Sequence, residues 1–213
     1  NTKLGTTCLA IGNPNSNGIS ITRGVVSRDS EQVNMTVAEV TKKRRVIRHD
    51  AYITNGSSGG GLFDMNGNLI GLTNGGERDE NHINYAIPSS IVYAVTQNIL
   101  KNCGDGINFA AKTTTLNAIT VGSETQTTYN SQTGFIDIVD TVIFAEIQDA
   151  SILKTTNVIA SGDKIKTIII NEGTAGEIKK DITRAFEIKE LLLYASAGDT
   201  LKIVVQRNGQ TLS

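Results

Sequence analysis

The decisive stretch of this 213-residue chain reads Gly56-Ser57-Ser58-Gly59-Gly60-Gly61 and continues as Leu62-Phe63-Asp64-Met65-Asn66-Gly67-Asn68-Leu69-Ile70-Gly71-Leu72. Glycines around a serine tolerate positive φ and let a substrate approach the backbone closely. A serine hydroxyl becomes a useful nucleophile when a tight turn holds it toward a base and aims backbone N–H groups at the developing oxyanion. The apolar runs on either side of Asn66-Gly67 are typical of a β-hairpin. We therefore interpret the stretch as a candidate nucleophile turn that leads into strands.

The same spacing, Gly56-x-Ser58-x-Gly60, also fits the nucleophile elbow of α/β-hydrolases. That elbow runs directly into a helix, whereas apolar strand patterns follow here. An acyl hydrolase of another fold is therefore the least favoured hypothesis, and esterase activity without peptidase activity would be needed to support it.

Further blocks surround the turn in a fixed order. Together with Gly56-Ser57-Ser58-Gly59-Gly60, they resemble the HtrA/DegP-type trypsin-like serine proteases of bacteria over roughly residues 4–100. The resemblance implies the second of that family's two β-barrels, with the first barrel missing from this sequence. The blocks are Leu9-Ala10-Ile11-Gly12-Asn13-Pro14, Gly24-Val25-Val26-Ser27, Asp50-Ala51, Gly67-Asn68-Leu69-Ile70-Gly71-Leu72 and Tyr85-Ala86-Ile87-Pro88.

By this resemblance Ser58 is the nucleophile, and the N–H groups of Gly56 and Ser58 form the oxyanion hole. Ser57 lies in the nucleophile loop where the family usually has Asn or Asp, a tolerable change because the backbone supplies the donor. No carboxylate stands at the pocket floor, so an apolar P1 residue of modest size is expected. Barrel core is the alternative role for the apolar residues among the pocket walls. These walls map onto Tyr52-Ile53-Thr54, Leu72-Thr73-Asn74 and Asn84-Tyr85-Ala86.

A catalytic triad also needs a histidine base and a carboxylate. The chain contains His49 and His82 only, and in the resembled family both triad partners lie N-terminal to the Ala10-Ile11 block. His49, beside Asp50, lies on the strand that enters the turn, so we favour a solvent-facing strand residue over a base. His82 follows a polar run and is expected in a hairpin loop. We expect this chain to be an internal piece of a longer protease and to be inactive alone.

Composition excludes several function classes. Lys and Arg total 20 against 21 Asp and Glu, and the net charge of −1 provides no global field for nucleic acid or anionic membrane. The basic run 42–45 is interpreted as a solvated strand end or loop. Cys8 and Cys103 are too few for a disulfide framework and are expected to be free thiols, Cys8 being a buried small hydrophobe. No membrane span is predicted, and neither a metal nor a cofactor is expected.

The pattern predicts a mainly β chain with two domains. Strands are expected over 4–12, 18–29, 32–49, 62–64, 68–73 and 83–87, which indicates an antiparallel barrel or sandwich. The family resemblance implies a barrel in residues 1–100. A closing helix is expected from Pro88 to about Leu100, followed by a linker over 101–112.

Residues 113–213 carry a different pattern, which resembles an α+β PDZ domain of the HtrA type with its last strand cut short. Strands are predicted over 142–147, 166–170 and 201–206, with turns at 161–165 and Asn208-Gly209. A short helical stretch is expected from 149, and an amphipathic helix over 182–195 with Asp181 as its N-cap. The polar segment 123–134 is expected to be a surface loop.

PDZ domains bind a peptide as an added strand and hold its carboxylate in a loop of N–H groups. The candidate loop is Leu116-Asn117-Ala118-Ile119, where the family has an apolar-Gly-apolar element. A side chain in place of that glycine can crowd the N–H groups, and a plain strand start is the alternative interpretation.

The favoured hypothesis is thus a serine endopeptidase that cleaves unfolded or damaged proteins outside the cytoplasm, in the cell envelope or secreted. Peptides or unfolded proteins are the expected partners. Homo-oligomer contacts and any membrane anchor are expected outside this chain, and no membrane contact is expected within it. The alternative is a non-catalytic peptide-binding module or a pseudoprotease.

Overall fold

The computed structural model describes residues 2–37, 39–77, 82–102, 119–148, 159–196 and 198–213. The chain divides into two compact units. The first comprises residues 1–93 together with 129–137, and the second comprises residues 94–128 and 138–213.

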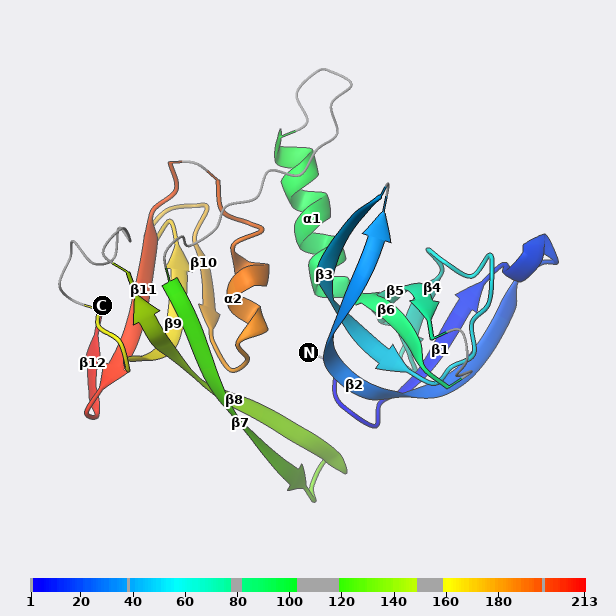
Figure 1. The fold of residues 1–213 in the computed structure, drawn as a ribbon, viewed down its shortest axis with the longest axis horizontal. Coiled ribbons are helices and arrows are strands. Elements are labelled where there is room, and N and C mark those ends of the chain that lie inside the picture. The colour runs from blue at the N-terminus through cyan, green and yellow to red at the C-terminus, as the bar shows by residue number, and fades with distance from the viewer. Residues whose placement is uncertain (1, 38, 78–81, 103–118, 149–158, 197) are drawn as a thin grey trace. The chain divides into compact units, whose positions relative to one another are not determined.

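The first unit is a closed antiparallel barrel with the strand order β1-β2-β3-β6-β5-β4 (Figure 1). Alternating apolar residues and glycine- or asparagine-rich turns produce these short strands. The predicted antiparallel barrel is confirmed. Its strands are β1 (Thr7–Gly12), β2 (Ser20–Val37), β3 (Val40–His49), β4 (Gly61–Asp64), β5 (Leu69–Gly76) and β6 (Asn84–Pro88), and a short 3-10 helix, η1 (Pro14–Ser16), follows β1.

The predicted break between strands at residues 30–31 is wrong, because β2 continues to Val37. Its pairing with β3 shifts register between Val26 and Arg28 and again between Arg28 and Glu31. Such irregularities absorb extra residues and bend a strand without ending it. The chain reverses further on, where Glu39 adopts a φ of 66° before β3. The basic residues 42–44 lie exposed on β3 beyond this turn, as predicted.

The barrel interior is filled by small and branched apolar side chains. Cys8 is fully buried, as predicted for a small hydrophobe, and burial raises the pKa of its thiol to about 11. Cys103 lies outside the described residues. The packed cluster comprises Cys8, Ala10, Val26, Ile47, Ala51, Leu62, Ile70 and Ala86.

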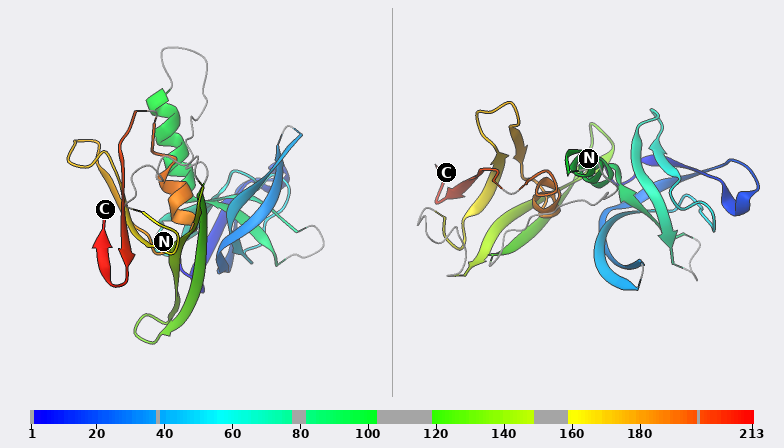
Figure 2. Two further views of the ribbon diagram at one scale, coloured as in Figure 1. Left: turned by 60° about the vertical axis from the view of Figure 1, so that its left-hand side comes forward. Right: turned by 90° about the horizontal axis from the view of Figure 1, so that it is seen from above.

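The second unit contains a sheet with the order β12-β11-β9-β8-β7, and β10 pairs with β9 (Figure 2). The predicted strands and the Asn208-Gly209 turn are confirmed. The predicted surface loop 123–134 is wrong, because most of it extends the β7–β8 hairpin; threonine-rich segments suit exposed strands. The strands are β7 (Ile119–Asn130), β8 (Phe135–Ile147), β9 (Lys164–Ile170), β10 (Ile178–Asp181), β11 (Leu201–Arg207) and β12 (Gln210–Leu212).

Two described helices accompany these sheets. The helix predicted after Pro88 is confirmed as α1 (Ser89–Asn102), although its residues from Ala94 onward belong to the second unit. The helix α2 (Phe186–Leu191) is much shorter than the predicted helix 182–195. Asp181 is the last residue of β10 and accepts a hydrogen bond from Thr167 at 2.8 Å, so it is not an N-cap. The apolar residues around α2 are still buried against the sheet, which explains why their spacing suggested a longer helix. The predicted helical stretch from 149 lies outside the described residues.

The core of the second unit is separate from that of the barrel. Val142, Phe144, Ile168 and Val205 from the sheet pack with α2 residues such as Ile188. Within the described residues, no helix is long and apolar enough to cross a membrane.

Candidate active site

Ser58 and Ser57 occupy opposite environments in the predicted nucleophile turn. Ser58 is exposed, and its Oγ lies 3.3 Å from the carbonyl oxygen of Asn74 on β5. Ser57 is only 7% exposed, and its Oγ accepts from the Thr54 N–H at 3.4 Å. The turn therefore presents one hydroxyl to solvent and uses the other internally.

The segment after β1 supports one side of the turn. The Asn15 N–H donates to the carbonyl of Asn55 at 2.9 Å, and the Ser57 N–H donates to Thr54 at 2.9 Å. Gly56 has a φ of +89°, and a Cβ there would lie 2.7 Å from the Asn15 nitrogen and 2.8 Å from the Asn13 oxygen. A larger residue at Gly56 would therefore meet both backbone strain and a steric clash.

The other side of the turn is bonded to β5. The Gly59 N–H donates to the Thr73 carbonyl at 2.7 Å, and the Thr73 N–H donates to the Gly60 carbonyl at 2.8 Å. Within the turn, the Gly60 N–H donates to the Ser57 carbonyl at 3.0 Å. These bonds fix the backbone on both sides of Ser58.

Two N–H groups of the turn stay available. Among the described residues, neither the Gly56 N–H nor the Ser58 N–H has a hydrogen-bond partner. These are the two donors that the family resemblance implies for an oxyanion hole. Unpaired donors near an exposed serine hydroxyl are what stabilisation of a tetrahedral oxyanion requires.

His49 does not act as a base for Ser58. Its side chain is fully buried in β3, in register with Val26 and Asn84, and neither ring nitrogen has a hydrogen-bond partner in the described structure. Burial lowers the pKa of His49 to about 4, so the ring is neutral at pH 7. The Asp50 carboxylate is also engaged, because it accepts from the Val25 N–H at 2.6 Å. His49 lies on a strand as predicted, but the expectation that it faces solvent is wrong, because its side chain is fully buried.

Side-chain burial divides the predicted pocket walls into two groups. Thr54, Leu72 and Asn74 are half-buried at the edge of the turn. Thr73, Asn84, Tyr85 and Ala86 are buried, so their side chains belong mainly to the barrel, the alternative left open by the sequence. Tyr85 donates to Glu77 at 2.9 Å, and burial together with this bond raises the pKa of Tyr85 to about 12.

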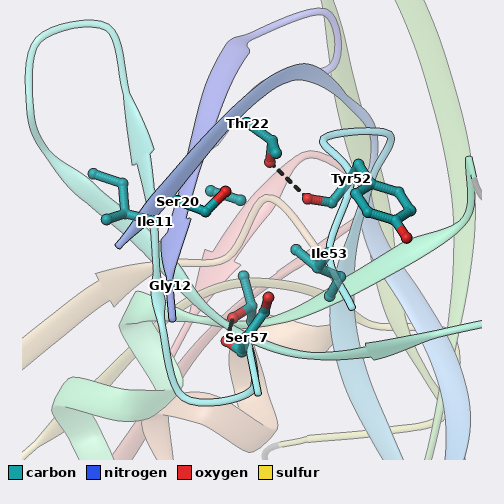
Figure 3. A pocket seen from close by; sticks show the side chains of 9 residues that line it. Ile11, Gly12, Ser20, Thr22, Tyr52, Ile53 and Ser57 are labelled. Carbon is teal, nitrogen blue, oxygen red and sulfur yellow. Dashed lines mark hydrogen bonds between the residues drawn. The ribbon is translucent and has the colours of Figure 1, made fainter. Parts of the chain in front are cut away.

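A small cavity of ≈ 10 Å³, room for about one water molecule, lies behind the turn (Figure 3). Hydroxyl groups from several strands line it, and Figure 3 shows Thr22 at one end and Ser57 at the other. Thr22 Oγ1 donates to the Tyr52 carbonyl at 2.6 Å. The polar lining sits directly against the backbone that carries Ser58.

A larger groove of ≈ 770 Å³ runs beside β5, and sequence reasoning did not find it. One wall is residues 31–36 of β2, and the other begins at Asn74, whose carbonyl is in contact with Ser58. The groove depends on how β2 bends past β5, and the sequence carries no local signal for that bend. Its position permits an extended chain to approach Ser58.

Leu116, Asn117 and Ala118 of the predicted carboxylate-binding loop lie outside the described residues. Ile119 begins β7 and packs against the core of the second unit. Across the described residues, no group of three or more His, Cys, Asp or Glu side chains is placed to hold a metal ion.

A closed antiparallel barrel that displays a glycine-flanked serine beside two unpaired N–H groups is the arrangement of a trypsin-like peptidase barrel. Comparison with known families agrees, because residues 1–72 match the trypsin-like peptidase domain.

Individual relatives agree with this family match. The serine protease Do-like HtrA of Bacillus subtilis is 26% identical over 216 residues, which cover 99% of this chain and 45% of that protein. The periplasmic serine endoprotease DegP of Salmonella typhimurium is 33% identical over 105 residues, covering 46% of this chain and 21% of that protein. The chain is thus related to the HtrA-type trypsin-like serine proteases, and it spans less than half the length of these relatives.

A solved structure, an HtrA-type protease AlgW with decapeptide, aligns with 99% of this chain and 59% of its own chain, at 25% identity and a TM-score of 0.48.

Proposed function

We propose that this chain carries the nucleophile half of a serine endopeptidase site, in which Ser58 attacks the substrate carbonyl and forms an acyl-enzyme. The Gly56 and Ser58 N–H groups would hold the oxyanion. The observation that carries the proposal is the exposed Ser58 hydroxyl beside two N–H groups that have no other partner in the described structure.

The base and its orienting carboxylate are not among the described residues around Ser58. His49 is buried and neutral, and Asp50 is bonded to the backbone of β2. We therefore infer that both groups are supplied by residues outside this sequence, in a longer protein. A serine without a base stays protonated and reacts slowly.

The proposed substrates are unfolded or damaged proteins, bound as extended peptides. The groove beside β5 supports this proposal because it leads from Asn74, whose carbonyl contacts Ser58, along residues 31–36 of β2. An extracytoplasmic location is supported by the similarity to a periplasmic endoprotease. Homo-oligomeric assembly is proposed for the whole protein.

A fluorophosphonate probe tests the proposed nucleophile. In a protein with the complete triad, we expect labelling at Ser58 and none in the Ser58→Ala variant, while Ser57→Ala serves as a matched control for the neighbouring hydroxyl. The 213-residue chain alone should stay unlabelled. Absence of labelling in a folded protein that has a histidine and a carboxylate in place would refute the proposal.

A non-catalytic peptide-binding role is the second candidate. It is favoured by the position of β7 at one end of the described sheet, where a strand edge is open to β-augmentation. We propose that the second unit is a PDZ-like domain that binds apolar C-terminal peptides next to Ile119. Isothermal titration calorimetry with a peptide library tests this role, and silence across the library would count against it.

A further inference from the structure

Thr73, predicted as part of a pocket wall, contacts the nucleophile turn through both its side chain and its backbone. Its side chain is 2% exposed, and its Oγ1 donates to the carbonyl of Ser57 at 2.5 Å. The Gly60 carbonyl lies further away, at 3.2 Å from the same oxygen. The Thr73 backbone also binds the N–H of Gly59 and the carbonyl of Gly60. The hydroxyl therefore faces the turn and not the substrate.

The direction of the Ser58 N–H follows from that bond. A peptide unit is planar and trans, so the carbonyl of Ser57 and the N–H of Ser58 point in opposite directions. A donor that holds the Ser57 carbonyl toward β5 therefore turns the Ser58 N–H away from β5. The Ser58 N–H has no partner of its own among the described residues, so the bond to the preceding carbonyl controls its orientation.

We propose that Thr73 is a positioning residue, whose hydroxyl holds the Ser57 carbonyl and so aims the Ser58 N–H at the oxyanion. This inference rests on the proposed peptidase function for its catalytic meaning, while the positioning itself is independent of catalysis. The Ser57 carbonyl keeps one other donor in the described structure, the Gly60 N–H of the same turn. Thr73 thus supplies the hydrogen bond that ties this peptide unit to the barrel.

The cavity behind the turn explains why the hydroxyl matters. Thr73 and Ser57 both line this small space of ≈ 10 Å³, so close packing is interrupted on that side of the peptide unit. Close packing would otherwise restrict its rotation. Without the hydroxyl, the Ser57–Ser58 peptide unit can rotate toward the cavity.

Nuclear magnetic resonance of the ¹⁵N-labelled chain tests the positioning directly. Thr73→Val removes the hydroxyl and keeps the side-chain shape, Thr73→Ser keeps the hydroxyl, and Thr22→Val removes a hydroxyl from the same cavity without touching the turn. We expect Thr73→Val to shift or double the amide signals of Ser58 and Gly59. Thr73→Ser and Thr22→Val should leave those signals near their wild-type positions.

Unchanged Ser58 and Gly59 signals in a folded Thr73→Val chain would overturn the proposal. If that variant does not fold, the wild-type chain provides the test. The buried Thr73 hydroxyl, bonded to the turn, should give a slowly exchanging proton close to the Gly60 amide. Failure to find that proton in the wild-type chain would equally overturn it.

Kinetics in a protein with the complete triad test the catalytic consequence. We expect Thr73→Val to lower kcat by about 10²-fold with little change in KM, as for loss of an oxyanion-hole donor, and Thr73→Ser to restore kcat. A wild-type protein without activity would refute the peptidase function and leave the resonance result standing. An active protein in which Thr73→Val keeps full kcat would overturn the catalytic part of the inference.

Discussion

At the scale of single residues, the nucleophile turn uses chemically similar groups for different purposes. Ser57 and Ser58 are adjacent serines, yet one is buried and accepts a backbone hydrogen bond while the other is exposed. Gly56 and Gly59 both have positive φ, yet a Cβ would clash at Gly56 and would meet open space at Gly59. Neighbouring positions of the same residue type are therefore predicted to differ in their tolerance of substitution.

The two glycines give a matched pair of variants. Gly59→Ala should cost roughly 1–2 kcal/mol, the strain of a left-handed alanine. Gly56→Ala should cost roughly 1–3 kcal/mol more, because its Cβ also meets the backbone of residues 13–15. Urea denaturation of the chain measures both, and equal losses for the two variants would contradict the clash at Gly56.

Buried His49 predicts an acid-sensitive barrel. Its folded pKa of about 4 lies below the ordinary value of 6.5, so between these values the unfolded chain binds the proton and the folded chain does not. Stability must therefore fall as the pH drops from about 6.5 to 4. We expect a loss of roughly 2–3 kcal/mol between pH 7 and 4.5 from this residue.

Urea titrations at several pH values test that linkage. His49→Leu should flatten the pH dependence in this window, whereas the exposed control His82→Gln should retain the wild-type slope. A wild-type slope in His49→Leu would show that other groups control the acid sensitivity.

At the scale of elements, an ion pair joins two strands of the second unit. Arg207, at the end of β11, donates through Nε and Nη2 to Asp163, just before β9, at 2.6 and 2.7 Å. Asp163 is 1% exposed, and the Arg207 guanidinium lowers the pKa of its carboxyl. The stabilisation of the fold by this ion pair is therefore present above the ordinary pKa of aspartate. It is lost as the pH falls through the lowered pKa of Asp163.

Removing one partner of this pair leaves a buried charge. Arg207→Ala should destabilise the second unit, and Arg207→Lys should recover only part of that loss because lysine lacks the planar fork. Lys202→Ala on the same strand breaks an exposed pair with Glu172 and should cost no more than about 1 kcal/mol. Thermal denaturation compares the three, and equal effects of Arg207→Ala and Lys202→Ala would contradict the role of burial.

At the scale of the whole molecule, two separate cores predict separable stability. Leu62 belongs to the barrel core and Phe144 to the core of the second unit, and both are fully buried. Leu62→Ala should cost about 2–5 kcal/mol and Phe144→Ala about 3–5 kcal/mol, each in its own unit. Native-state hydrogen exchange measures the stability of each unit separately. Loss of protection in both units from either variant would show that they unfold together.

Much of the barrel follows from local signals. The Asn66-Gly67 turn, the alternating runs around it and the helix after Pro88 all depend on neighbours in the chain, and the structure has each of them. The predicted break at 30–31 and the long helix 182–195 failed for a shared reason. Polar residues at 30–31 suggested a turn, but pairing with β3 keeps them within β2. Apolar spacing over 182–195 suggested one long helix, but these residues are buried by packing on the sheet.

The amino-acid order by itself determined the turn around Ser58, because glycines at 56 and 59 permit a backbone that other residues resist. It also determined the antiparallel β class through the period of its apolar residues. Only the tertiary structure decided which serine is exposed, that His49 is buried and that the Thr73 hydroxyl reaches the Ser57 carbonyl. These features join residues far apart in the chain, and their geometry depends on how the strands close into a barrel.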